Sequence, residues 1–281
     1  MKLLHRRQFL YLAGLGGAAA LGGAAAWLAA QARHYVRERA LQLQVLRVQA
    51  EGVADKIGQF IKEIEAQLGW TTQLPLSPAT IEQRRSDATL LLRQVPAILE
   101  FSQLDSSGRE QLKVSRRGLH FECCRTDFSQ DPEFTVAMAK GLYYGPVYLG
   151  GWGRNSPYMT LALARTKRDP GVSIAEIDVK FVCDIVAGVK IGQAYVIDAQ
   201  GRLIAHPDIS RVLGNTDVLH FTHLQPGRTD GARGGEQVQE ARDTHGHDVL
   251  IAYAPVVPPG WLVFVELPLH RLAVTPESKA P

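Results

Sequence analysis

The stretch YVIDAQGRLIAHPDISRVLGNTD, from Tyr195 to Asp217, determines the expected fold. An apolar run leads into Asp198-Ala-Gln-Gly201, which is typical of a tight turn, and a second apolar run ends at His206-Pro207-Asp208. Because proline gives no donor to a sheet ladder, we expect Pro207 to end the second strand and Asp208 to hydrogen-bond the following turn. The stretch therefore predicts a strand, a turn and a strand.

A second stretch, VLIAYAPVVPPGWLVFVELP from Val249 to Pro268, predicts the end of the same sheet. Its two apolar runs flank Pro258-Pro259-Gly260, and proline with glycine is typical of a turn between two strands. A long polar loop separates this hairpin from the first one. The sequence of residues 191–268 therefore predicts one small module with an antiparallel sheet.

The residues before this module follow a similar order. Ile98 to Leu104, the turn Asp105-Ser-Ser-Gly108 and Gln111 to Val114 predict a strand, a turn and a strand. Further elements are expected downstream, namely strands at 143–149, 158–164 and 172–179 and a short helix at 181–186. Because helices precede the strands and do not alternate with them, the pattern predicts an α+β fold and argues against a doubly wound sheet.

The N-terminal part of the chain predicts a membrane anchor. Residues 9–31 contain an uncharged run that would be about 33 Å long as a helix, close to the thickness of a bilayer core. Arg6 and Arg7 resemble a twin-arginine export signal, and Ala30-Gln31-Ala32 offers a cleavage site, so removal of the segment stays open. Because the run is longer than a typical signal-peptide core, we expect a retained transmembrane helix behind a cytoplasmic tail at 1–8.

A long stalk helix is expected next, over residues 33–74. Apolar residues recur at alternating spacings of three and four from Leu43 to Ile64, which is the pattern of an amphipathic helix. One interpretation lays this stripe on a sheet of the same chain, and the other makes it the seam of a parallel homodimer. Pro75 ends the helix because proline removes a backbone donor. A second helix is expected between Ser77 and Pro96.

These strings resemble a known family. The two stretches quoted first, in order and at workable spacing, are similar to the membrane-proximal module of double Cache sensor domains, which are PAS-like. Five further segments resemble the membrane-distal module of the same family. They are LRQVPAILEFSQLDSSGREQLKVSR, TDFSQDPEF, YYGPVYL, SPYMTLALA and GVSIAEIDVKFVCDIV. The resemblance divides the chain into a distal module at 75–190, a proximal module at 191–268 and a polar tail at 269–281.

The resemblance implies an extracytoplasmic sensor of the kind carried by bacterial histidine kinases, nucleotide cyclases and chemoreceptors. The chain ends in HRLAVTPESKAP where such receptors continue into a second membrane helix and an output domain. Two expectations stay open, namely a separate kinase or cyclase as partner, or a truncated receptor gene. The expected location is the bacterial inner membrane, crossed once, with the bulk of the chain in the periplasm. The link at 189–193 is shorter than usual for the family, and the loop at 150–154 is also unusual.

The resemblance also implies that the distal module binds a small molecule. Aromatic side chains beside a few polar groups suit such a pocket. The candidates for ligand binding are Tyr143, Tyr144, Tyr148, Tyr158, Thr160 and Asp178. Each tyrosine fits core packing equally well. The segment TDFSQDPEF lacks the arginine and aromatic set of amino-acid-binding relatives, so an amino-acid ligand is not supported, although Asp178 is suited to receive an amine.

Other functions lack support in the sequence. A net charge of +3 does not indicate nucleic-acid binding. None of the common catalytic or nucleotide-binding motifs is present, so we expect neither an enzyme nor a cofactor. The alternatives kept open are an exported periplasmic solute-binding protein and, behind it, a metal-dependent hydrolase.

The hydrolase alternative depends on histidines in or beside the polar loop. His220, His223, His245 and His247 offer nitrogen ligands, but no cysteine or clustered carboxylate completes a site, so no metal is expected. The adjacent Cys123 and Cys124 with Cys183 do not form an even disulfide framework. We expect a buried thiol at Cys183.

Overall fold

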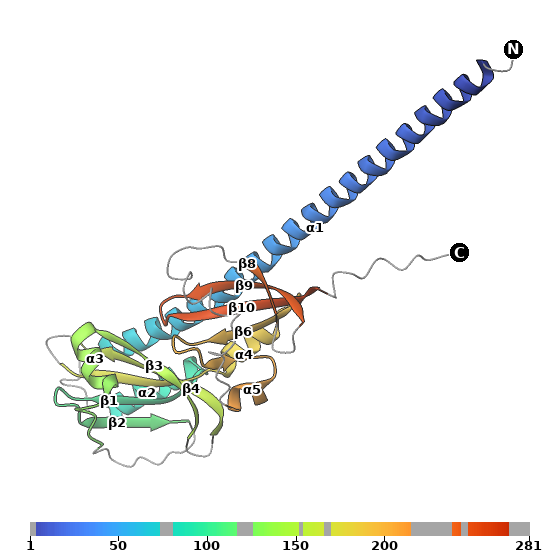
Figure 1. Cartoon of the computed structure of the whole chain (residues 1–281). Helices are drawn as coiled ribbons and strands as arrows, with labels where there is room; N and C mark the ends of the chain where they lie inside the picture. Colours follow the sequence, from blue (N-terminus) through green and yellow to red (C-terminus); the bar gives the residue numbers. More distant parts are fainter. Residues whose placement is uncertain are drawn as a thin grey trace. The chain divides into compact units, whose positions relative to one another are not determined.

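The computed structural model describes residues 4–73, 81–116, 126–151, 154–165, 170–214, 238–242 and 247–269 (Figure 1). The chain divides into two compact units, Met1–Val45 and Leu46–Pro281. The first unit contains the N-terminal part of helix α1, which runs from Leu4 to Gln73. The second unit contains two five-stranded antiparallel sheets, so the predicted α+β class with two antiparallel sheets is confirmed.

The predicted membrane anchor stays a prediction. Within the described part of the chain, no helix combines the length and apolar character that crossing a bilayer requires. Most side chains of residues 9–31 lie outside what the structure describes.

The distal sheet has the strand order β2-β1-β5-β4-β3. Its elements, with two helices, are α2 (Ile81–Gln94), β1 (Ile98–Leu104), β2 (Glu110–Ser115), α3 (Pro132–Lys140), β3 (Leu142–Gly151), β4 (Arg154–Ala164) and β5 (Val172–Asp178). The turn between β1 and β2 forms because Asp105 Oδ1 accepts the backbone N–H groups of Ser107 and Arg109. Gly108 supplies the positive φ of 83° that this turn requires.

The proximal sheet has the strand order β7-β6-β10-β9-β8. Its elements are α4 (Lys180–Ala187), β6 (Gln193–Ile197), β7 (Leu203–Ala205), α5 (Ile209–Leu213), β8 (Val238–Arg242), β9 (Asp248–Val256) and β10 (Trp261–Pro268). Strand β7 ends before Pro207, and Asp208 caps α5 by accepting the N–H of Ser210, as the sequence predicts. Helix α5 and strand β8 were not expected, because both lie in the segment interpreted as a polar loop.

Side-chain alternation gives the distal sheet two different faces. Residues two apart along a strand share a face. Leu104, Ala162 and Ile174 form one apolar cluster with Phe134 and Ala137 of α3. This face, toward α3, is called the α3 face below. Thr160 is two residues from Ala162 and therefore shares the α3 face.

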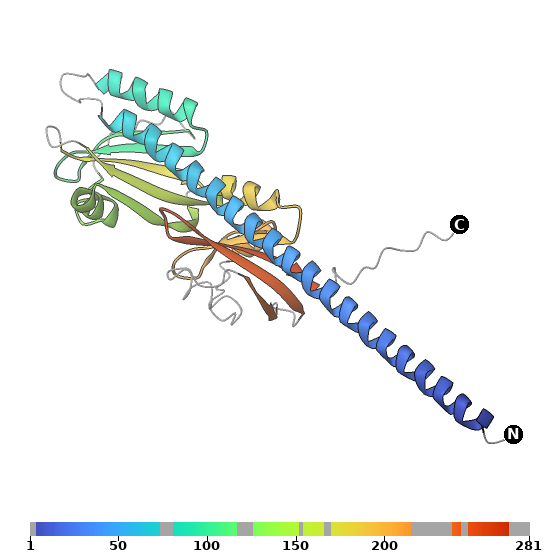
Figure 2. The same cartoon turned by 90° about the horizontal axis from the view of Figure 1, so that it is seen from above.

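The apolar stripe of α1 packs within the second unit. Leu46, Ile57 and Leu68 are fully buried, which confirms the interpretation that the stripe lies against the chain's own sheets. Close approaches occur at two points along the contact. A Cβ atom on Gly58 would meet the Val257 carbonyl oxygen at 2.9 Å, and one on Gly69 would lie 3.7 Å from Leu163. Figure 2 shows this part of α1 passing beside both sheets.

The homodimer seam predicted for the same stripe therefore needs correction. A side chain that is buried against its own chain is not available to a second copy. Val53 and Ile57, chosen from the sequence as seam residues, are 6% and 0% exposed. A homodimer through other parts of the long helix stays a prediction.

Candidate functional site

A small cavity opens on the α3 face of the distal sheet. Its volume is about 80 Å³, below the roughly 300–1,000 Å³ of pockets that enclose drug-sized ligands. Four strands, α3 and the segment before α3 contribute its lining residues, which are Glu100, Ser102, Lys113, Phe128, Glu133, Thr160, Ile174 and Glu176. The site is therefore compact and mainly polar.

Thr160 of β4 forms part of the cavity wall and is only 4% exposed. Gly145 on the neighbouring strand makes room beside it, because a Cβ atom there would meet the Thr160 Cβ at 3.1 Å. The hydroxyl of a threonine can both donate and accept a hydrogen bond, which suits a polar group of a ligand.

Lys113 is the cation of the lining, and it is already paired. Its Nζ forms an ion pair with Glu100 across the β1–β2 ladder. Burial by itself lowers the pKa of Lys113, but the hydrogen bond and charge of Glu100, with the charges of Glu110 and Glu176, raise this pKa above its ordinary value. The Ser102 hydroxyl donates a 2.8 Å hydrogen bond to Glu110 beside this pair.

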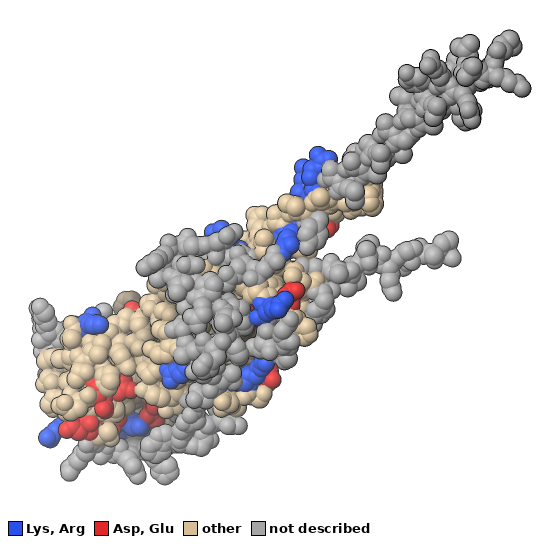
Figure 3. Space-filling view, in the orientation of Figure 1, with Lys and Arg blue, Asp and Glu red and all other residues tan. Residues whose placement is uncertain are grey.

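Glu133 brings a further carboxyl group from α3. Burial raises the pKa of Glu133 above its ordinary value, and the neighbouring charges of Asp131 and Glu176 add to this effect. Glu133 and Glu176 therefore repel each other across the cavity. Figure 3 shows acidic side chains gathered over the distal sheet. Among the described residues of the lining, carboxyl groups therefore outnumber cations.

A pair of tyrosines extends the site along the β3–β4 hairpin. Tyr148 and Tyr158 are register partners, and their rings stack with centroids 5.5 Å apart at an angle of 30°. Burial raises the pKa of Tyr148, and the charge of Glu133 contributes to the rise. Burial and the neighbouring Tyr148 and Glu133 likewise raise the pKa of Tyr143. These aromatic groups therefore lie on the acidic side of the sheet.

Asp178 lies next to this tyrosine pair but also has a structural task. It is the register partner of Tyr158 on β5. Its Oδ1 accepts the backbone N–H of Lys180 at 2.9 Å, at the first residue of α4. A carboxylate here supports the start of that helix, so its removal would affect both the helix and the site.

Tyr144 does not lie with the other residues that the sequence predicts to bind the ligand. Its hydroxyl donates a 2.6 Å hydrogen bond to Glu65 of α1, and it pairs in register with Leu161. Burial, and then this hydrogen bond with Glu65, raise the pKa of Tyr144 above its ordinary range. The structure therefore brings Tyr143, Tyr148, Tyr158, Thr160 and Asp178 to one side and leaves Tyr144 on the other.

Sequence reasoning missed the charged half of the lining. The missed residues are Glu100, Ser102, Lys113, Glu133 and Glu176. A signal was present, since Glu100 and Ser102 lie on either side of Phe101 in a strand that is mainly apolar. Polar residues at alternating positions read first as a solvated face. Only the position of α3 shows that this face is partly covered.

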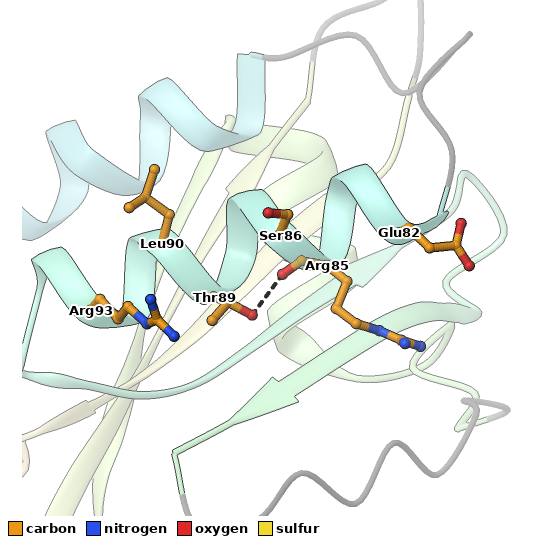
Figure 4. A pocket seen from close by; sticks show the side chains of 6 residues that line it. All are labelled: Glu82, Arg85, Ser86, Thr89, Leu90 and Arg93. Atoms are coloured by element: carbon orange, nitrogen blue, oxygen red, sulfur yellow. Dashed lines mark hydrogen bonds between the residues drawn. The ribbon is translucent and has the colours of Figure 1, made fainter.

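A different hollow lies on α2. Its volume is about 390 Å³, and its lining residues are Glu82, Arg85, Ser86, Thr89, Leu90 and Arg93. Figure 4 shows that all six side chains come from this helix alone, with the Thr89 hydroxyl bonded to the Arg85 carbonyl. Because the described lining residues all belong to one helix, this hollow is a weaker candidate than the cavity, which several elements line.

The alternative of a metal site finds no support among the described residues. No group of three or more His, Cys, Asp or Glu side chains there is arranged to hold a metal ion. His247 is exposed, whereas His220, His223 and His245 lie outside the described residues. Cys183 is a buried free thiol whose pKa is raised by burial, and Cys123 and Cys124 also lie outside the described residues.

Two small antiparallel sheets with a long N-terminal helix define the fold, and solved structures share it. The structure is similar to the ligand-binding domain of the Campylobacter jejuni chemoreceptor Tlp3 in complex with 4-methylisoleucine, with a TM-score of 0.66 and 14% identity over 85% of this chain and 94% of that one. It is also similar to the extracellular domain of the putative histidine kinase soHK1S-Z6, with a TM-score of 0.61 and 18% identity over 85% and 98%.

A third similar structure is the ligand-binding domain of the Pseudomonas aeruginosa amino acid chemoreceptor PctC in complex with GABA. Its TM-score is 0.59, with 15% identity over 80% of this chain and 99% of that one. No protein-family model matches the sequence, and no curated protein matches it either. The chain has the double Cache fold of these sensory domains, as the sequence resemblance implies.

Proposed function

We propose that this chain is the small-molecule sensing part of a bacterial signalling system and that its ligand binds in the distal cavity. The observation that carries the proposal is the cavity itself, where residues of four strands and of α3 surround Thr160, a polar residue that is only 4% exposed. The fold adds support, because structures similar to it are named as ligand-binding domains of receptors. These neighbours are named as sensory or ligand-binding domains and not as enzymes, which agrees with a function in sensing without catalysis.

Contacts between the two modules provide a route for the signal. Helix α5 of the proximal module contacts strands β3 and β4, which carry Tyr148 and Tyr158. The Arg202 guanidinium acts on Tyr148 as well, because its charge opposes the rise in the pKa of that tyrosine. Arg202 is itself held by an ion pair with Asp198 at 2.7 Å. A ligand that moves the tyrosine pair would therefore act directly on the β6–β7 turn.

The location and the partners complete the proposal. A retained anchor at 9–31 would hold the modules in the periplasm, and a separate kinase or cyclase would receive the signal. An exported periplasmic binding protein is the second candidate, favoured by Arg6 and Arg7 before the apolar run. N-terminal sequencing of the mature protein distinguishes the two, because a form that begins at Arg33 would indicate export with cleavage.

A thermal-shift screen of the full-length protein tests the sensing function. A ligand at about 100 times its dissociation constant stabilises the folded state by about 2.7 kcal/mol. For a folded unit of this size, that raises the melting temperature by several degrees. The shift should disappear in Thr160→Val, with Thr89→Val on the half-buried Thr89 of α2, away from the cavity, as the matched control. A ligand whose shift persists in Thr160→Val would place binding outside the cavity and contradict the proposal.

A further inference from the structure

We infer that the proximal module contains a proton-operated switch, in which the His206 ring controls how helix α5 packs against strands β3 and β4. The switch does not depend on the ligand of the distal cavity. His206 lies directly after β7, and Asp208 caps α5 two residues later. Because α5 contacts β3 and β4 of the distal module, a change at this ring reaches the strands that carry Tyr148 and Tyr158.

Both nitrogens of the His206 ring face N–H donors. The backbone N–H of Asp208 lies 2.9 Å from Nδ1, and Nη1 of Arg211 lies 3.4 Å from Nε2. The side-chain amide of Gln193, 2.6 Å from Nε2, can donate or accept. A neutral imidazole offers one acceptor nitrogen to these groups, whereas an imidazolium has two donors and no acceptor. Protonation therefore turns at least one favourable contact of the ring into a repulsive one.

The backbone of Asp208 offers the protonated ring a different partner. Its carbonyl oxygen lies 3.1 Å from Nδ1 and also accepts the N–H of Arg211, at 3.2 Å, in the first turn of α5. A proton on Nδ1 would exchange the bond from the Asp208 N–H for a bond to the Asp208 carbonyl. The Asp208 carboxylate accepts the N–H of Ser210 at 3.0 Å and so caps the helix. The exchange thus acts on the groups that start α5.

Burial and charge decide when the ring takes up a proton. His206 is 4% exposed, so an imidazolium there is poorly solvated. Burial, and then the charge of Arg211, lower the pKa of His206 below its ordinary value of 6.5, although Asp208 and Glu266 act in the opposite direction. The ring is therefore neutral above pH 6.5 and becomes protonated only in acid. The titratable and charged groups around it are Asp208 and Arg211 at α5, Glu266 of β10, Tyr195 of β6 and Cys183 of α4.

Helix α5 is suited to respond because it is short. It runs only from Ile209 to Leu213, and an isolated helix of this length is not stable in water. It is held by the Asp208 cap and by the side chain of Val212, which is fully buried in the apolar cluster of the proximal sheet. Weakening the start of α5 therefore loosens this helix before it loosens the sheets, whose strands are joined by continuous ladders.

Hydrogen exchange of the full-length protein, followed by mass spectrometry from about pH 7.5 to about pH 5 and corrected for intrinsic exchange rates, tests the inference. In the wild type, protection of residues 206–214, β3 and β4 should fall about tenfold as the pH decreases, whereas β1 and β5 should keep theirs. His206→Asn should show no such fall, because asparagine does not titrate. His34→Asn, at an exposed histidine of α1, is the matched control and should behave as the wild type.

A second pair of variants decides the question if His206→Asn does not fold. Arg211→Gln removes the charge beside Nε2 and should move the midpoint of the fall to higher pH, whereas Arg211→Lys keeps the charge and should leave the midpoint near that of the wild type. An unchanged midpoint in Arg211→Gln would overturn the inference, as would a fall that persists in His206→Asn or that extends equally to β1 and β5.

The link between the modules has its own contradicting result. A fall confined to residues 206–214, with β3 and β4 unchanged, would show that the ring does not act on the distal module and would overturn the switch. None of these outcomes bears on ligand binding in the distal cavity, which the thermal-shift screen tests separately.

Discussion

The hydroxyl of Tyr144 donates a 2.6 Å hydrogen bond to Oε2 of Glu65 and so joins the distal sheet to helix α1. The neighbouring Tyr143 packs instead against the apolar cluster that includes Phe134 of α3. Adjacent residues of a strand point to opposite faces, which separates the two tyrosines. Strand β3 thus presents one tyrosine to the helix and others to the cavity side.

Tyr144→Phe should destabilise the protein without changing ligand affinity. The substitution removes one hydrogen bond to a carboxylate, which costs about 1 kcal/mol and lowers the melting temperature by about 2–4 °C. Thermal unfolding followed by circular dichroism measures the change. Tyr143→Phe is the matched control, because the described residues give the Tyr143 hydroxyl no hydrogen bond, and its melting temperature should stay near that of the wild type. A loss of ligand binding in Tyr144→Phe would place Tyr144 in the site after all.

Tyr158→Ala should abolish the ligand-induced thermal shift, because it removes half of the stacked pair beside the cavity. Asp178→Ala should also reduce the shift, but it should lower the melting temperature of the free protein as well, since the Asp178 carboxylate accepts the N–H of Lys180 at the first residue of α4. The double variant His245→Ala with His247→Ala serves as the control and should keep the full shift. Loss of the shift only in the histidine variant would indicate that the ligand binds at the polar loop and not at the tyrosine pair.

Val53→Glu and Ile57→Glu should each unfold the second unit, because they place an uncompensated charge where the helix is buried. The expected cost is about 3–5 kcal/mol, measured by urea unfolding. Leu41→Glu is the matched control on the same helix, since Leu41 is 63% exposed, and it should change the unfolding free energy by less than about 0.5 kcal/mol. Dissociation of an intact dimer by Ile57→Glu, with no loss of stability, would restore the seam interpretation.

His206 should make the protein less stable in mild acid. It is 4% exposed, its Nδ1 accepts the N–H of Asp208 at 2.9 Å, and Arg211 lies beside its Nε2. Burial and the Arg211 charge lower the pKa of His206 below its ordinary value of 6.5. The unfolded chain therefore binds a proton that the folded chain resists. Stability is complete above pH 6.5 and falls as the pH decreases toward the folded-state pKa.

His206→Asn tests this dependence, because asparagine keeps an acceptor for the Asp208 N–H and does not titrate. The difference in unfolding free energy between wild type and variant should shrink as the pH falls from about 7.5 to 5.5. Urea unfolding at several pH values measures it. A difference that is constant or grows in acid would show that His206 is not held neutral.

The local turn chemistry made much of the fold predictable. Asp198 and Gly201 mark the β6–β7 turn, and Asp198 Oδ1 accepts the N–H groups of Gln200 and Arg202 there. Such turns depend on near neighbours in the chain, and so a sequence pattern describes them well. The same holds for His206-Pro207-Asp208, which ends β7 and caps α5. Strand β8 escaped prediction because the segment Val238–Arg242 is mostly polar and gains its place only by pairing with β9.

The candidate site was predictable only in part. The tyrosine pair and Thr160 lie in strands that the apolar pattern predicts, and their alternation places them on one face. The acidic residues depend on long-range pairing, because Glu100 and Glu176 meet only when β1 pairs with β5. Glu133 joins them from a helix between β2 and β3 in the chain. No local pattern in the sequence indicates that these three glutamates come together.

A crystal structure of the protein grown with a saturating ligand from the thermal-shift screen tests the central claim most directly. We predict ligand density in the distal cavity, with a ligand atom within hydrogen-bonding distance of the Thr160 hydroxyl. Density in the α2 groove or in the proximal module, with the distal cavity empty, would contradict the account.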